Sequence, residues 1–315
     1  IPFALTQTYS GTLRETGETI VPMKAGIVAF FANLLLDYSL IFGKFGFPEL
    51  GVRGAAIATV IARIAEVTVV MVWAHSHTAE KPFVRGVYRS FHVPMDLVKE
   101  VIKKGTPLLL NETLWAGGMA MLVRCYSSRG LVVVAGINIA TTLSNMFSIV
   151  YIAMGSAIGI ILGQLLGAGK MEEAVDTDRK LIFFSVASCL GVAILMIIVS
   201  PFFPQIYNTS DDVKYIAAWI IRVLAVCMPL NAFMNSTYFT LRSGGKTIVT
   251  FLFDSFYIWV VDIPAAILLI NYTDWNVILV YFLVQMMEIV KCIIGYVLVK
   301  KGVWLNNMTI KAANS

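Results

Sequence analysis

The chain contains eight runs of about 20 or more mostly apolar residues, and these runs limit the folds it can adopt. Inside a bilayer, a helix satisfies all of its backbone polar groups within itself. Only 14% of the residues are charged, against about 25% in a soluble domain. We therefore predict an all-α membrane protein with spans at residues 22–43, 52–74, 105–126, 131–163, 181–204, 213–239, 247–270 and 276–299.

The Lys and Arg residues outside these spans fall mainly on one side of the predicted membrane. Residues 1–11 read as the end of a further span. With that span included, alternate connections hold 16 and 4 basic residues. We expect the richer set in the cytoplasm, with the C-terminus on the same side. This loop bias also accounts for the net charge of +5, so we expect no nucleic-acid partner.

The sequence shows no motif for catalysis or for a structural metal. The four cysteines lie in apolar runs without a CxxC pair, which argues against disulfides and zinc. Neither a Ser/His/Asp set nor an HExxH motif is visible, and nothing resembles the selectivity filter of a channel. We therefore expect neither an enzyme nor a resident cofactor.

A ten-residue sequence occurs twice, at residues 12–21 and 240–249. TLRETGETIV and TLRSGGKTIV agree at seven of ten positions. Six predicted spans separate the two copies, so both are expected on the cytoplasmic side in the same orientation. In each copy we predict a turn with positive φ, at Gly17 and Gly245. The repeated sequence is interpreted as structural rather than catalytic.

The repeat predicts two pseudo-symmetric six-helix lobes. In that plan the complete protein has about 440 residues and about twelve spans, of which about eight and a half are present in this chain. Residues 1–74 then belong to the first lobe, residues 75–104 form a cytoplasmic linker, and residues 105–315 form the second lobe.

Several stretches, in order and at the expected spacing, resemble the multidrug and toxic compound extrusion (MATE) transporters, in particular their NorM-like branch. They are residues 12–19, 33–43, 48–59, 163–170 and 241–247. The resemblance implies a monomer of the bacterial plasma membrane that exports cationic amphiphilic compounds. It also implies exchange for inward Na⁺ or H⁺ by alternating access between two lobes.

Glu112 is the strongest candidate for ion coupling. It lies well inside the span at residues 105–126, with no basic residue within one helical turn. A carboxylate in a span is costly and is by default a functional hypothesis. It can hold a proton, or bind a cation such as Na⁺ when deprotonated. The resemblance places Glu112 at the coupling acid of NorM-like relatives.

The resemblance also implies a second acid in the span at residues 213–239, but this chain has none there. That face carries Asn231, Asn235 and Tyr238 instead, at i, i+4 and i+7. Asp254 in the next span is the best substitute. Further residues are candidates to line a cavity for flat cations through polar and aromatic contacts: Asn111, Trp115, Asn138, Asn145, Met228 and Tyr257.

Other ionisable residues in the spans are interpreted as structural. Arg63 and Glu66, like Glu288 and Lys291, are three residues apart and can pair along one helix face. Asp37 is read as structural as well. One alternative function remains open, a flippase for a lipid-linked anionic precursor. Its cavity would need several unpaired basic residues, whereas these spans hold six acids and four bases.

Overall fold

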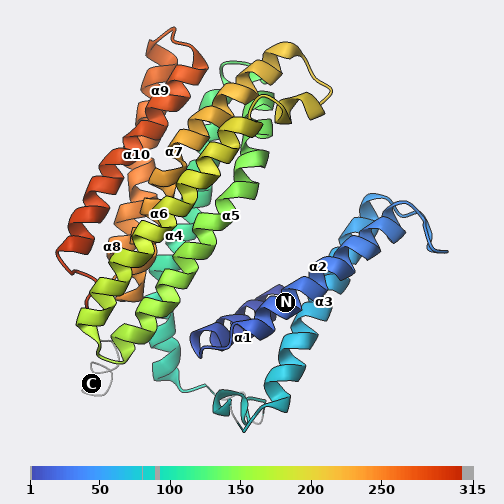
Figure 1. The fold of residues 1–315 in the computed structure, drawn as a ribbon, viewed down its shortest axis with the longest axis vertical. Helices are drawn as coiled ribbons and strands as arrows, with labels where there is room; N and C mark the ends of the chain where they lie inside the picture. The colour runs from blue at the N-terminus through green and yellow to red at the C-terminus, as the bar shows by residue number, and fades with distance from the viewer. Residues whose placement is uncertain (1, 80, 89–92, 307–315) are drawn as a thin grey trace. The chain divides into compact units, whose positions relative to one another are not determined.

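The computed structural model describes residues 2–79, 81–88 and 93–306, and these residues form helices and turns with no strand (Figure 1). The chain divides into two compact units, Ile1–Pro94 and Met95–Ser315. The division falls inside the range that the sequence assigned to a linker, residues 75–104.

The first unit consists of three helices and one short 3₁₀ turn. Its helix α1 covers Pro2–Glu15, α2 covers Ile20–Ile41, α3 covers Val52–Ser76 and η1 covers Pro82–Val84. Helices α2 and α3 pack closely because Gly54 has no side chain. A Cβ atom at this position would lie 2.6 Å from the carbonyl oxygen of Leu40.

The second unit contains the remaining helices. They are α4 (Met95–Ser127), α5 (Leu131–Gly167), α6 (Met171–Val199), η2 (Phe203–Ile206), α7 (Asp211–Ser243), α8 (Thr247–Phe251), α9 (Ile263–Tyr272) and α10 (Val277–Lys300). Between α8 and α9 the chain continues as two π-helical segments, η3 (Leu252–Phe256) and η4 (Ile258–Asp262). The segments from α8 to α9 together form one span, Thr247–Tyr272.

Helix α7 lies at the centre of the second unit. It packs against α5, α6 and α10, which run beside it in Figure 1. Half of its most apolar stretch is buried, against 22% for α5 and for α6. Its buried residues therefore form much of the core.

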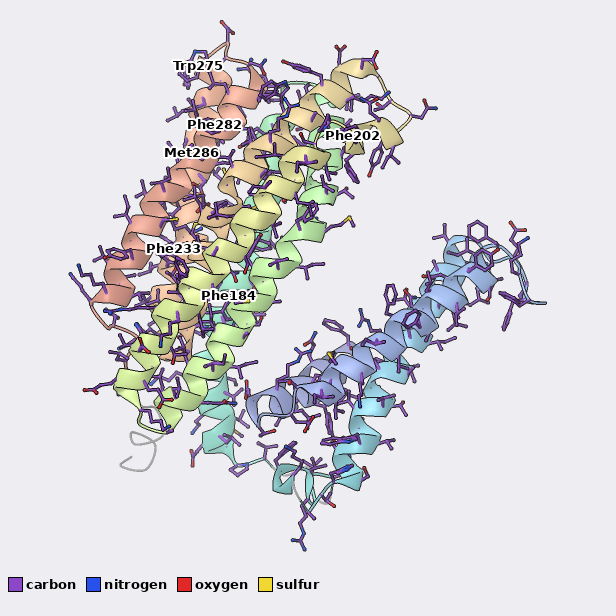
Figure 2. All side chains as sticks on the ribbon, viewed as in Figure 1. Phe184, Phe202, Phe233, Trp275, Phe282 and Met286 are labelled. Atoms are coloured by element: carbon purple, nitrogen blue, oxygen red, sulfur yellow. The ribbon has the colours of Figure 1, made fainter. Side chains whose placement is uncertain are left out.

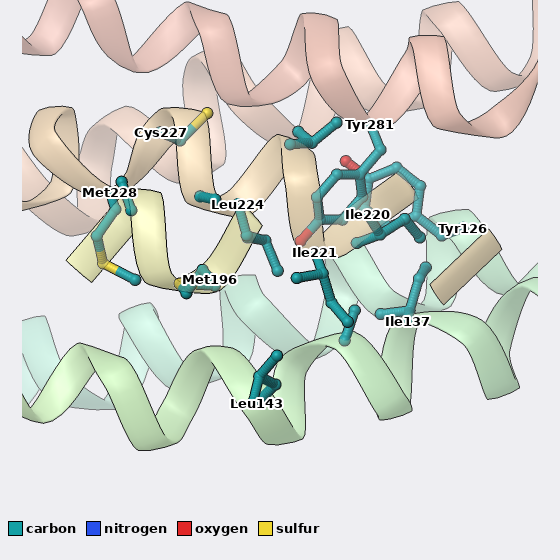
Figure 3. Close-up of a cluster of buried hydrophobic side chains, with 14 of the residues drawn as sticks. Tyr126, Ile137, Leu143, Met196, Ile220, Ile221, Leu224, Cys227, Met228 and Tyr281 are labelled. Atoms are coloured by element: carbon teal, nitrogen blue, oxygen red, sulfur yellow. The ribbon is translucent and has the colours of Figure 1, made fainter. Parts of the chain in front are cut away.

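That core joins residues from several helices, as Figure 3 shows. The ring of Tyr126 on α4 lies 5.1 Å from the ring of Tyr281 on α10, between centroids. Leu143 of α5, Met196 of α6 and Leu224 of α7 belong to the same buried cluster.

The outward faces of the helices are also apolar. On α6, for example, Phe183 and Phe184 expose 75% and 59% of their surface (Figure 2). In water such a surface would be a liability, whereas lipid tails solvate it. Apolar residues both inside and outside the bundle are the pattern of a membrane-embedded protein.

Each of the eight predicted spans corresponds to a helix. Seven helical segments in the described part of the chain are long and apolar enough to cross a membrane. Helix α4 is not among them, because polar Asn111 and Glu112 and several small residues dilute its apolar stretch. It also begins at Met95, so the helix includes the last ten residues of the predicted linker.

The two copies of the repeated sequence adopt the predicted turn. Gly17 has φ 86° and Gly245 has φ 71°. In each copy the glycine N–H donates to the carbonyl of the arginine three residues earlier, at 3.1 Å in the first and 2.9 Å in the second. Leu13 and Leu241, at matching positions, are both fully buried. The repeated sequence therefore forms the same helix-ending turn in both places.

Candidate functional site

Lys291 on α10 lies between two carboxylates inside the second unit. Its Nζ is 3.2 Å from Glu288 Oε2 on the same helix and 3.5 Å from Asp254 Oδ1 on η3. The side chain of Lys291 is only 6% exposed. A buried ammonium is retained only when it is paired, so these contacts stabilise one another. Two carboxylates against one lysine leave the group with an excess of negative charge.

Asn111 of α4 connects this group to α7. Its Nδ2 donates to Asp254 Oδ2 at 3.1 Å and lies 3.4 Å from the Tyr238 hydroxyl. Ser255 donates its hydroxyl to the carbonyl and the side-chain oxygen of Asn111, at 2.6 and 2.8 Å. Asn111 is 1% exposed. The Asp254 carboxylate is therefore contacted by α4 through Asn111 and by α10 through Lys291, while α7 contacts Asn111.

The π-helical segments carry the other polar groups of this region. Asp262, at the end of η4, is 2% exposed, and its Oδ1 has no hydrogen-bond partner among the described residues. Tyr257 donates its hydroxyl to the Met287 carbonyl at 2.7 Å, and Lys291 Nζ lies 5.6 Å from the centre of its ring. π-helical turns occur often at functional sites, which fits this concentration of buried polar groups.

Of the predicted site residues, the structure brings together Asp254, Tyr238, Asn111 and, through Lys291, Tyr257. Glu112 is exposed on α4, and no ion pair to it is found within the described residues. It follows Asn111 directly, so its side chain leaves the helix in a different direction. The expected burial of Glu112 is not seen in this unit, and its coupling role stays a prediction.

The remaining predicted residues lie elsewhere. Met228 is 1% exposed in the hydrophobic core, so its assignment to a cavity lining is wrong. Asn235 packs over Gly155 of α5, and Asn231 is partly buried on α7. Three others are exposed on their helices, Trp115 on α4 and Asn138 and Asn145 on α5. The polar stripes of α5 and α7 share no hydrogen bond between described side chains.

The first unit contains one ion pair on α3 and two buried polar groups on α2 that lack hydrogen-bond partners among the described residues. Arg63 and Glu66 form the predicted ion pair, at 2.6 Å. On α2, however, Asn33 Nδ2 and Asp37 Oδ1 are buried without a hydrogen-bond partner among the described residues. They are four residues apart and share a face. An unsatisfied carboxylate and amide one turn apart do not fit the purely structural role predicted for Asp37.

Sequence reasoning missed two features of the second unit. It paired Lys291 only with Glu288 of the same helix. The one sequence feature that pointed to a second acidic partner was the position of this lysine deep within a span, where a charge is costly. It also placed Asp178 outside the spans. Asp178 is 1% exposed and accepts a 2.7 Å hydrogen bond from Thr240, which joins α6 to α7.

The helices, their lipid-facing surfaces and the buried charges define a polytopic α-helical membrane protein. The MatE family model matches residues 107–268, just over half of the 315 residues. The chain belongs to the MatE family.

Its relatives include two bacterial proteins at 25% identity. One is the probable multidrug resistance protein NorM of Thermotoga maritima, matched over 86% of this chain and 57% of the relative. The other is the probable multidrug resistance protein YoeA of Bacillus subtilis, matched over 85% and 58%. The chain therefore spans less than two thirds of the length of these relatives.

Solved structures of the same kind share the fold. A mutant of the Vibrio cholerae MATE transporter VcmN aligns with a TM-score of 0.82 at 17% identity, over 96% of this chain and 66% of that one. A MOP superfamily transporter from Pyrococcus furiosus aligns with a TM-score of 0.84 at 19% identity, over 95% and 66%. The two-lobe MATE fold predicted from the repeat is confirmed.

Proposed function

We propose that the protein exports cationic amphiphilic compounds from the cell in exchange for inward Na⁺ or H⁺. The observation that carries this proposal is the excess of carboxylate around Lys291 inside the second unit. Glu288 and Asp254 share one ammonium, and Asp262 lies nearby in sequence with an unpaired oxygen. Uncompensated negative charge in a low-dielectric interior is costly, so this group favours binding of a cation or a proton.

Exchange follows if the two cations compete for the same negative charge. When Na⁺ or H⁺ neutralises a carboxylate, the positively charged substrate loses its electrostatic partner and is released. When the ion leaves, the site attracts substrate again. Alternating access between two lobes would expose this site to each side of the membrane in turn. The acid excess disfavours the alternative substrate, an anionic lipid-linked precursor.

Asp254 is the residue proposed to take up the coupling cation, with Asn111 and Tyr238 as positioning residues. Asn111 supplies an amide whose orientation is fixed by Ser255. Glu112 is proposed to contribute a second carboxylate on the exposed face of α4, where Trp115 is also exposed. A tolerant site for flat cations combines such charge with aromatic surface.

The proposal also concerns where and how the protein works. Its bacterial relatives support a place in the plasma membrane of a bacterium, and the loop bias in Lys and Arg favours a cytoplasmic C-terminus. The names of the two relatives describe multidrug resistance, which supports an export direction. A monomer suffices for the mechanism.

Transport by the full-length protein in liposomes tests the proposal. Efflux of a fluorescent cation such as ethidium is followed under an imposed Na⁺ or pH gradient. Asp254→Asn should abolish gradient-driven efflux, whereas Asp176→Asn, an exposed acid of α6, should leave it intact. Absence of ethidium movement under either gradient would show that the protein is not a cation-coupled exporter. Equal activity of Asp254→Asn and the unmodified protein would exclude Asp254 as the coupling residue.

A further inference from the structure

An open groove of about 450 Å³ runs between α7 and α10 in the second unit. Its walls are mainly apolar and aromatic. Two polar side chains also line it, those of Arg222 and Asn276. The apolar wall includes Trp219, Val226, Leu279 and Phe282, the last of which is labelled on α10 in Figure 2.

The polar part of the groove lies level with two helix ends. Arg222 Nε donates to Ser200 Oγ at 3.1 Å, and Ser200 is the first residue after α6. Asn276 is the residue that caps the start of α10. Helix termini in a membrane protein sit where water and headgroups can satisfy their free backbone groups. Arg222 is therefore placed at the depth of the lipid headgroups.

Aromatic residues mark the same level. Trp219 and Tyr215, one and two turns before Arg222 on α7, are 39% and 58% exposed. Trp275, beside the start of α10 in Figure 2, is 47% exposed. Tryptophan and tyrosine gather where the apolar layer meets the headgroups. Their exposure supports the depth assigned to Arg222.

The Arg222 guanidinium has capacity for an anion. It lies over the Trp219 ring, 4.6 Å from the ring centre, and among the described residues its one hydrogen bond is from Nε to Ser200. No carboxylate lies within ion-pair distance of Arg222 among the residues that the structure describes. Its planar Nη groups match two oxygens of a phosphate, and the stacking on Trp219 fixes the plane.

We propose that this groove binds one anionic phospholipid from the surrounding bilayer. The phosphate lies on Arg222, and an acyl chain follows the apolar wall past Val226 and Leu279. The unpaired arginine favours a headgroup with a net negative charge over a zwitterionic one, which carries a cation beside its phosphate. None of the residues that line the groove belongs to the group around Lys291, so this proposal does not depend on the transport proposal.

Native mass spectrometry of the full chain in detergent tests this site. Added phosphatidylglycerol should remain bound to the unmodified protein in preference to phosphatidylcholine. Arg222→Gln should reduce retained phosphatidylglycerol by about tenfold, the value of one charge-assisted contact. Lys214→Gln removes the same charge from α7, where Lys214 is paired with Asp211 at 3.7 Å, and should leave retention unchanged.

A second variant tests the apolar wall without touching the charge. Val226 is 55% exposed, so Val226→Trp fills the groove without disturbing the core, and it should lower retention of both lipids. The proposal is overturned if Arg222→Gln retains as much phosphatidylglycerol as the unmodified protein. It is equally overturned if Lys214→Gln loses as much lipid as Arg222→Gln, or if Val226→Trp loses none. Displacement of the lipid by inorganic phosphate alone would assign the site to a free anion instead.

Discussion

Lys291 Nζ lies 3.5 Å from Asp254 Oδ1, so a lysine on α10 and an aspartate on η3 form an ion pair across two segments. Lys291 also pairs with Glu288 of its own helix at 3.2 Å. The lysine thereby links the π-helical region to the last helix. This one ammonium offsets the electrostatic repulsion between the two carboxylates.

Removing the ammonium should therefore destabilise the second unit strongly. Lys291→Met leaves the half-buried Asp254 and Glu288 without their cation, and we expect the free energy of unfolding to fall by about 1–3 kcal/mol. Lys180→Met is the matched control, because Lys180 pairs with Asp176 at 2.6 Å on the exposed face of α6. An exposed pair contributes less than about 1 kcal/mol.

Thermal unfolding of the purified chain in detergent measures the difference between these variants. Adding Asp254→Asn and Glu288→Gln to Lys291→Met should restore part of the loss, because the buried charges then disappear together. If Lys291→Met and Lys180→Met lower the unfolding temperature equally, the ion pairs of Lys291 are no more important than an exposed pair.

Asn111 should be needed for stability because it satisfies two neighbours. In Asn111→Leu, Ser255 loses its side-chain acceptor and Asp254 loses an amide donor. We expect a loss of about 1–3 kcal/mol for the groups left unsatisfied. Asn138→Leu alters an exposed asparagine of α5 and should cost nothing. Urea titration followed by tryptophan fluorescence compares them, and a larger loss for Asn138→Leu would refute the network.

The contact between α5 and α7 depends on a glycine. A Cβ at Gly155 would lie 2.0 Å from Asn235 Oδ1 and 2.6 Å from Phe239 Cδ2. Gly155→Ala should lower stability by about 1–3 kcal/mol, the range for overpacking. Gly163→Ala lies two turns on along α5, where a Cβ meets no atom within 4 Å. Unfolding temperatures should separate the two, and tolerance of Gly155→Ala would show that the helices pack more loosely.

The two turns of the repeated sequence should respond alike to substitution. Gly17→Ala and Gly245→Ala place a Cβ on residues with positive φ, which costs about 1–2 kcal/mol each. Gly11→Ala is the control, because Gly11 is helical and its Cβ would meet no neighbour within 4 Å. Limited proteolysis at the two turns reports local opening. Resistance equal to that of the unmodified chain would mean that the glycines are not required.

The helices were predictable because the bilayer imposes a strong and simple rule on composition. All eight predicted spans are helices, and the turns at Gly17 and Gly245 followed from the repeat. Helix α4 begins at Met95, ten residues before the predicted span, because the charged residues 95–104 form helix outside the apolar stretch as well. Periodicity alone does not say where along a helix the lipid begins.

The candidate site was only partly predictable. Asp254, Asn111 and Tyr238 were named from residue type, but their partners were not. The stripe on α7 faces two neighbours, so Asn235 meets α5 while Tyr238 meets α4. Lys291 contacts two acids, Glu288 on its own helix and Asp254 on η3. The contact with Asp254 depends on how α10 packs against η3. That packing involves π-helical turns, which a 3.6-residue period does not describe.

In the two π-helical segments each backbone hydrogen bond spans five residues, one more than in the α-helix on either side. Conversion of one segment to α-helix would rotate everything beyond it by about 100° about the helix axis. Asp254 lies within the first segment and Asp262 ends the second, so such a conversion would turn one carboxylate relative to the other. A change in helical winding within this span would therefore reorient a carboxylate while the helix stays continuous.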